Sequence, residues 1–171
     1  MTVIRNGRVV PDSWRPARGG PAAEKAGHVY VTPDQWAADP DGWRAHPGPI
    51  GLRLASDQPP AMLADDLGRF DLILLEFPAF TDGRAYSYAR QLRERHGYAG
   101  ELRAVGDVLR DQLLFMFRCG IDSFEVDLGG NAAAEAWAEA AAEISVWYQS
   151  MPADRRPPLA RPGARRAGGR G

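Results

Sequence analysis

A chain of 171 residues with 44% hydrophobic and 25% charged residues has the size and composition of one globular domain with its own core. Its longest strongly apolar stretch, around Leu72 to Leu75, is far too short to cross a bilayer, and its first ten residues lack the apolar run of a signal peptide. The single cysteine, Cys119, excludes an internal disulfide and a self-contained iron–sulfur cluster. We therefore expect a cytoplasmic protein with no membrane segment.

Charge is distributed unevenly along the chain. Residues 1–150 contain 15 basic and 21 acidic side chains, which gives a net charge of −6, whereas residues 151–171 contain six arginines and one aspartate, which gives +5. The C-terminal segment has too few apolar side chains to pack, so we expect residues 151–171 to be a disordered tail. Arginines without interleaved aromatic residues are typical of a solvated tail, so nucleic-acid binding is not expected.

Several kinds of cofactor and metal site are excluded by missing motifs. The histidines His28, His46 and His96 lie far apart and follow no metal-ligand spacing. The chain also lacks the glycine-rich dinucleotide motif, the P-loop and the G-x-S-x-G nucleophile elbow. We therefore expect neither a bound cofactor nor a metal ion.

The N-terminal residues predict a β-hairpin over residues 1–10, because two β-rich triplets flank Asn6-Gly7, which favours a type I′ turn. Residues 11–27, rich in Pro, Gly and Ala, predict a loop. Strands then alternate with helices. The predicted strands are 29–31, 50–54, 72–76, 102–105 and 123–126, and the predicted helices start at Pro33, Pro60, Asp82, Asp107 and Asn131.

This alternation predicts one α/β domain over residues 1–150. About five strand–helix units with right-handed crossovers build a mainly parallel sheet. An open sheet like that of flavodoxin or a response-regulator receiver is the favoured arrangement, and a partial βα barrel is the alternative. Apolar strands such as Leu72 to Leu75, buried on both faces, agree with either arrangement.

Polar side chains cluster after the third and fourth strands of this alternating series. Ligands of open α/β sheets bind beyond the carboxyl ends of the strands, and loops that follow neighbouring strands are expected to converge there. The candidate functional surface consists of Glu76, Phe80, Thr81, Asp82, Arg84, Asp107, Arg110, Asp111 and Gln112.

The members of this surface differ in how easily local structure explains them. Asp82 and Asp107 are interpreted first as helix N-caps, which need no ligand. Arg84 and Arg110 are harder to explain, because each lies in the first turn of a predicted helix, where the helix dipole disfavours a cation. We expect each arginine to reach an anion, a partner or a neighbouring aspartate. Glu76 is either a proton-transfer group or the ion-pair partner of an arginine.

Cys119 is the one redox candidate. It follows an apolar helical stretch and precedes Gly120. The dipole at a helix C-terminus opposes thiolate formation, whereas Arg118 favours it. We interpret Cys119 as a structural thiol.

Four segments of the chain together resemble an uncharacterised bacterial family of unknown function. They are EFPAFTDGRAYS (76–87), LRER (92–95), GELRAVGDVLRDQ (100–112) and RCGIDSF (118–124). Members of this family are assigned as oxidoreductases of sulfite reduction and are typically encoded beside assimilatory sulfite reductase. The resemblance is close over about residues 70–126 and looser over the hairpin and the Trp36 region.

The resemblance implies a role in sulfate assimilation. Sulfite reduction is multi-electron chemistry that a cofactor performs, and the sequence has no signature for one. We therefore expect an accessory protein that acts with sulfite reductase or another protein of the pathway. The alternative is a small enzyme or sensor that binds an oxyanion, sulfite or sulfate, through the loops after the third and fourth strands.

Overall fold

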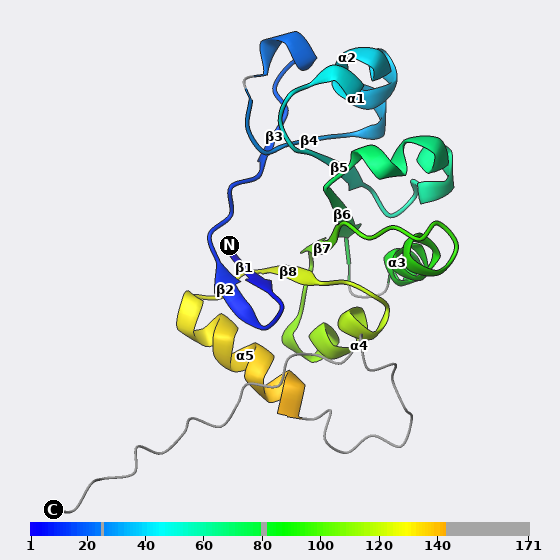
Figure 1. Cartoon of the computed structure of the whole chain (residues 1–171). Coiled ribbons are helices and arrows are strands. Elements are labelled where there is room, and N and C mark those ends of the chain that lie inside the picture. The colour runs from blue at the N-terminus through cyan, green and yellow to red at the C-terminus, as the bar shows by residue number, and fades with distance from the viewer. Residues whose placement is uncertain (25, 80–81, 143–171) are drawn as a thin grey trace, which may run out of the picture.

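The computed structural model of the chain describes residues 1–24, 26–79 and 82–142. These residues form a mixed α/β fold around an open, curled sheet of eight strands, most of them parallel (Figure 1). The strand order across the sheet is β2-β1-β8-β7-β6-β5-β4-β3. The predicted tail (151–171) and the C-terminal part of the last predicted helix (143–149) lie outside the described residues.

The strands are β1 (Thr2–Arg5), β2 (Arg8–Val10), β3 (Arg15–Pro16), β4 (Val29–Val31), β5 (Ile50–Leu54), β6 (Leu72–Phe77), β7 (Glu101–Gly106) and β8 (Ser123–Val126). The α-helices are α1 (Pro33–Ala38), α2 (Pro40–Ala45), α3 (Arg84–Glu94), α4 (Leu113–Arg118) and α5 (Gly130–Ala142). Three 3-10 segments complete the described chain: η1 (Pro21–Ala23), η2 (Pro60–Arg69) and η3 (Arg110–Gln112). None of the described helices is long and apolar enough to span a membrane.

The predicted N-terminal hairpin is confirmed. Strands β1 and β2 pair antiparallel, and Asn6 and Gly7 have φ values of +50° and +77°, as a type I′ turn requires. The other side of β1 pairs antiparallel with β8, with Ile4 opposite Phe124. The hairpin therefore extends the parallel sheet beside the last strand of the chain.

The strand order bears on the two predicted arrangements. From β3 to β8 the strands follow one another across the sheet in chain order. A flavodoxin-like sheet has the order 2-1-3-4-5, and its ligand site lies where that order reverses. The described sheet has no such reversal among its parallel strands, so the flavodoxin-like arrangement is not confirmed. Consecutive order is what a partial βα barrel requires.

Consecutive order also explains where the helices lie. Right-handed crossovers between neighbouring strands that always advance in one direction pass over the same face of the sheet. Figure 1 shows α3 and α4 on the outer side of the curl, with α1 and α2 beside β4 and β5. We call the opposite, inner side of the curled sheet the concave face.

Local signals explain how the segment around α1 and α2 folds. Thr32 caps α1 as predicted: its Oγ1 accepts the Gln35 N–H at 3.3 Å, and Gln35 Oε1 accepts the Thr32 N–H at 2.9 Å. Helix α2 was not predicted, although Asp39 caps it through the Gly42 N–H at 2.9 Å. Strand β3 lies within the predicted loop 11–27 and pairs in parallel with β4.

The main core lies between the sheet and the helices. Along β6, Ile73, Leu75 and Phe77 belong to this core, whereas Leu72 and Leu74 point to the concave face. The concave face carries a smaller apolar cluster of Leu72, Leu74 and Val105, with Trp14 and Tyr30 packed against it. The sheet is therefore buried on both faces near its centre.

Candidate functional site

The loops that follow β6 and β7 meet at the carboxyl edge of the sheet. Phe77 and Gly106 are paired residues at the ends of these strands, and the Asp107 N–H donates to the Phe77 carbonyl oxygen at 2.7 Å. Gly106 has φ +96°, and a Cβ at this position would clash with the same carbonyl oxygen. The predicted convergence of the two loops is confirmed, and it depends on a glycine.

Asp82 and Arg84 form a two-point ion pair at the start of α3. Arg84 donates from Nε to Asp82 Oδ1 at 3.0 Å and from Nη2 to Oδ2 at 2.7 Å, and Nη2 also donates to Ser56 Oγ at 3.0 Å. The N-cap position belongs to Gly83, so the prediction that Asp82 is the N-cap is wrong. Asp82 nevertheless accepts the N–H of Arg84, the first helical residue, at 3.2 Å.

This arrangement changes the acidity of Asp82. The hydrogen bonds from the Arg84 side chain, together with those from Ser56 and the Arg84 N–H, hold the pKa of Asp82 well below its usual range. The carboxylate is therefore charged at neutral pH, and it compensates the charge of Arg84 at close range.

The segment after β7 differs from its prediction. Asp107 is exposed and does not cap a helix; helical structure begins only at η3, with Leu109 in the capping position. Gln112 instead holds this turn, because its buried side-chain Oε1 accepts the Leu109 N–H at 3.3 Å. The prediction that Asp107 is an N-cap is therefore wrong, since the chain makes an extra turn before the helix.

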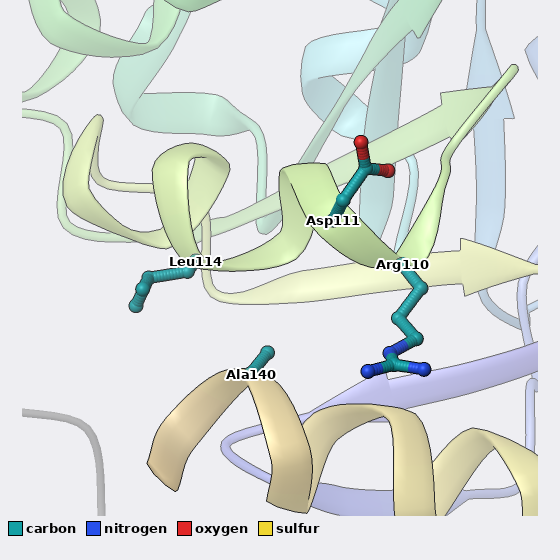
Figure 2. A pocket seen from close by; sticks show the side chains of 4 residues that line it. All are labelled: Arg110, Asp111, Leu114 and Ala140. Carbon is teal, nitrogen blue, oxygen red and sulfur yellow. The ribbon is translucent and has the colours of Figure 1, made fainter. Parts of the chain in front are cut away.

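Arg110 pairs with a helix that lies far away in the sequence. Its Nη2 is 2.6 Å from Glu139 Oε2 on α5, and both side chains are more than half exposed. Figure 2 shows Arg110 pointing toward α5, while Asp111 points to the other side of η3. Arg110 and Asp111, with Leu114 and Ala140, line a hollow of about 300 Å³. The positive charge of Arg110 in this hollow is therefore already compensated by Glu139.

Glu76 lies near the carboxyl end of β6, next to Arg53 of β5. Glu76 Oε2 accepts a hydrogen bond from Arg53 Nε at 3.3 Å, and both side chains are about one third exposed. Glu76 was expected to be either a proton-transfer group or the ion-pair partner of an arginine, and the contact with Arg53 is such an ion pair.

The remaining candidates are Cys119, Phe80 and Thr81. Cys119 is buried directly after α4, and burial raises the pKa of its thiol, although a hydrogen bond from Arg90 acts in the opposite direction. A buried thiol of this kind fits the packing role that we expected. Phe80 and Thr81 lie outside the described residues.

Sequence reasoning missed a buried charged network on the concave face. Arg103 donates to Glu101 Oε1 from Nε at 3.1 Å and from Nη2 at 2.9 Å, and its Nη1 donates to Asp12 at 2.9 Å. Ser123 Oγ also donates to Glu101 Oε1, at 2.6 Å, and Arg5 lies 3.1 Å from Oε2. Within residues 1–24, 26–79 and 82–142, no three His, Cys, Asp or Glu side chains are grouped as metal ligands would be.

Residues 51–159 match the model of a family described as a bacterial protein of unknown function, DUF934. The chain belongs to the DUF934 family. The DUF934 match begins within β5 and spans the loops after β6 and β7, so it contains the ion pairs of Asp82 and Arg110. The N-terminal hairpin and β3 lie outside the DUF934 match. Among curated proteins, none matches the chain.

Proposed function

We propose that the protein is an accessory protein of sulfite reduction in sulfate assimilation, which docks on sulfite reductase and is not itself the cofactor-bearing reductase. The resemblance of residues 76–87 and 100–112 to proteins encoded beside sulfite reductase supports the choice of pathway. We place the docking surface at the carboxyl edge of the sheet, and we define it as Asp107, Leu109, Asp111 and Phe115.

The observation that carries the proposal is the exposure of two large apolar side chains between β7 and β8. Leu109 is 42% exposed and Phe115 is 46% exposed. The Phe115 ring packs edge-on against Tyr86 at 4.9 Å, and Tyr86 packs in the same way against buried Phe77 at 5.0 Å. An exposed ring that is already fixed to the core loses little conformational entropy when a partner covers it.

The charges around these side chains suit an interface. Asp107 and Asp111 are exposed, and neither forms an ion pair within the described part of the chain. An apolar centre with a polar rim is typical of protein interfaces. Carboxylates at the rim favour a partner surface with basic side chains, because complementary charge raises the association rate. Association should therefore slow as salt concentration rises.

The alternative function, an oxyanion-binding enzyme or sensor, has weaker support. The guanidinium group of Arg84 is held by Asp82 and Ser56, and that of Arg110 is paired with Glu139. Sulfite or sulfate would have to displace a carboxylate that already occupies each arginine. Such a displacement yields little net binding energy, because one charged contact is exchanged for another.

A growth experiment tests the pathway and the surface together. Deletion of the gene should abolish growth on sulfate and on sulfite, while growth on sulfide or cysteine continues. A plasmid copy of the wild type should restore growth, and a copy with Phe115→Ser should restore it poorly.

Met62→Ser is the matched control for this experiment. Met62 is 54% exposed but lies on η2, so its replacement removes a similar apolar side chain elsewhere. The control should restore growth fully. Normal growth of the deletion strain on sulfate and sulfite would contradict the proposed pathway.

A further inference from the structure

A second hollow lies on the concave face, at the amino-terminal ends of the parallel strands. Its volume is about 570 Å³, within the range of small-molecule pockets. Figure 1 shows the linker between β2 and β3 running along the open side of the curl, and residues of this linker form one wall. The side chains that matter for its chemistry are Arg5, Trp14, His28, Asp71, Glu101 and Arg103.

Trp14 fixes one wall of the hollow. A Cβ added to Gly51 would lie only 3.2 Å from the Trp14 ring, so the ring rests closely on the bare backbone of β5. The ring also packs against the concave apolar cluster and meets His28 edge-on at 5.0 Å. The linker therefore contributes a fixed aromatic surface.

Glu101 and Arg103 form a rigid polar wall. Their side chains are only 5% and 4% exposed, and each is satisfied by the other together with Ser123 and Asp12. A buried ion pair is often no more stabilising than apolar side chains of the same volume. The free energy of folding alone therefore does not explain this network. Its role is better explained by the fixed polar wall that Glu101 and Arg103 give the hollow.

Arg5 and Asp71 keep unused hydrogen-bonding capacity. Arg5 is half exposed and contacts Glu101 through Nη1; its Nε and Nη2 have no acceptor among the described residues. Asp71 accepts the Ile50 N–H on Oδ2 at 3.3 Å, and Arg69 Nη1 lies 4.0 Å from the same oxygen, whereas Oδ1 has no donor within the same part of the chain. Each group thus has one ion-pair partner, Glu101 for Arg5 and Arg69 for Asp71, and keeps further atoms for hydrogen bonds to a ligand: Nε and Nη2 on Arg5 and Oδ1 on Asp71.

We infer that this hollow binds a small zwitterion of the free α-amino acid class, with its carboxylate on Arg5, its ammonium group on Asp71 and its side chain against Trp14. A simple anion or cation would engage only one of the two groups. A zwitterion satisfies both with charge-assisted hydrogen bonds. This site is separate from the docking surface, because the two lie at opposite ends of the parallel strands.

Isothermal titration calorimetry of the full chain tests the inference, with L-alanine, L-leucine and L-phenylalanine as probes. At least one of them should bind with a Kd of about 1 mM or tighter. Acetate and ethylammonium chloride, which carry the two charges separately, should show no binding at the same concentrations. Arg5→Gln and Asp71→Asn should each weaken binding about tenfold or more, as expected for a lost charge-assisted hydrogen bond.

Arg8→Gln is the control, because Arg8 is an exposed arginine on the adjacent strand β2, outside the hollow. It should bind as the wild type does. In an NMR titration of the wild type, the Trp14 indole resonance should shift with amino-acid concentration and give the same Kd as calorimetry. Absence of binding by all three amino acids at about 10 mM would overturn the inference, since that Kd corresponds to less than about 3 kcal/mol. Equal binding of acetate, or unchanged affinity in Arg5→Gln, would also overturn it.

Discussion

Gly106 and Phe77 are paired at the ends of β7 and β6, and the backbone of the residue after Gly106 bonds to the Phe77 carbonyl oxygen at 2.7 Å. Gly106 has a positive φ at this contact, and a Cβ added to it would clash with the same oxygen. The contact joins the loops after two neighbouring strands, and Asp107 of the docking surface follows it directly. The position of the docking surface therefore depends on one backbone turn.

Gly106→Ala should destabilise the protein by at least about 2 kcal/mol, because a Cβ meets the Phe77 carbonyl and the left-handed conformation is strained for alanine. Urea unfolding measures this change. Gly68→Ala, at a glycine with open space around it, should change stability by less than about 1 kcal/mol. Equal stability of Gly106→Ala and the wild type would contradict the described turn.

The Asp82–Arg84 ion pair predicts a defined dependence of stability on pH. The pKa of Asp82 is lowered in the folded protein from its ordinary value of 3.8. A carboxyl group with a lowered pKa in the folded protein stabilises the folded state. This stabilisation is complete at pH values above the pKa of the unfolded state, and it is lost as the pH falls toward and through the pKa of the folded state. The contribution of Asp82 should therefore be constant from pH 7 to about pH 5 and should decline below about pH 4.

Urea midpoints of the wild type and Asp82→Asn, measured between pH 7 and pH 2.5, test this prediction. The wild type should be the more stable protein at pH 7, and the gap should narrow below about pH 4. Glu135→Gln, at an exposed carboxylate without an ion pair among the described residues, controls for general charge effects. A gap that stays constant across the whole range would show that the ion pair does not form in solution.

The compensated charge of Arg84 predicts how the protein responds to oxyanions. Millimolar sulfite or sulfate should not raise the melting temperature of the wild type above that in chloride of equal ionic strength. Asp82→Asn releases the guanidinium group of Arg84 and should gain a shift that depends on anion concentration. A shift in the wild type that Arg84→Gln abolishes would instead favour the oxyanion-binding function.

The parts of the fold that were predicted correctly carry local signals. Asn6-Gly7 predicts the hairpin turn, and Thr32 followed by Pro33 predicts the start of α1, because both patterns act within a few residues. The apolar runs that form β5 and β6 likewise predict buried parallel strands. The order of strands across the sheet has no comparable local signal, because alternating strands and helices are common to the flavodoxin-like order and to the consecutive order from β3 to β8.

The candidate site was predicted less well, because its ion pairs join distant segments. Arg110 pairs with Glu139 on α5, and Arg103 with Asp12, a residue 91 positions away, so no local spacing reveals either contact. One signal was available: the charges of Glu101 and Arg103 alternate with apolar residues, which places both on the same face of β7. The predicted strand, which begins at Leu102, omits Glu101 at the start of β7.

The most direct test of the proposed function is a binding titration between the full chain and its sulfite reductase, followed by biolayer interferometry. We predict a Kd of about 10 μM or tighter, an association rate that falls with salt, and about tenfold weaker binding by Phe115→Ser and by Leu109→Ser. Met62→Ser should bind as the wild type does. Absence of binding at about 100 μM, or full affinity in both Phe115→Ser and Leu109→Ser, would contradict docking through this surface.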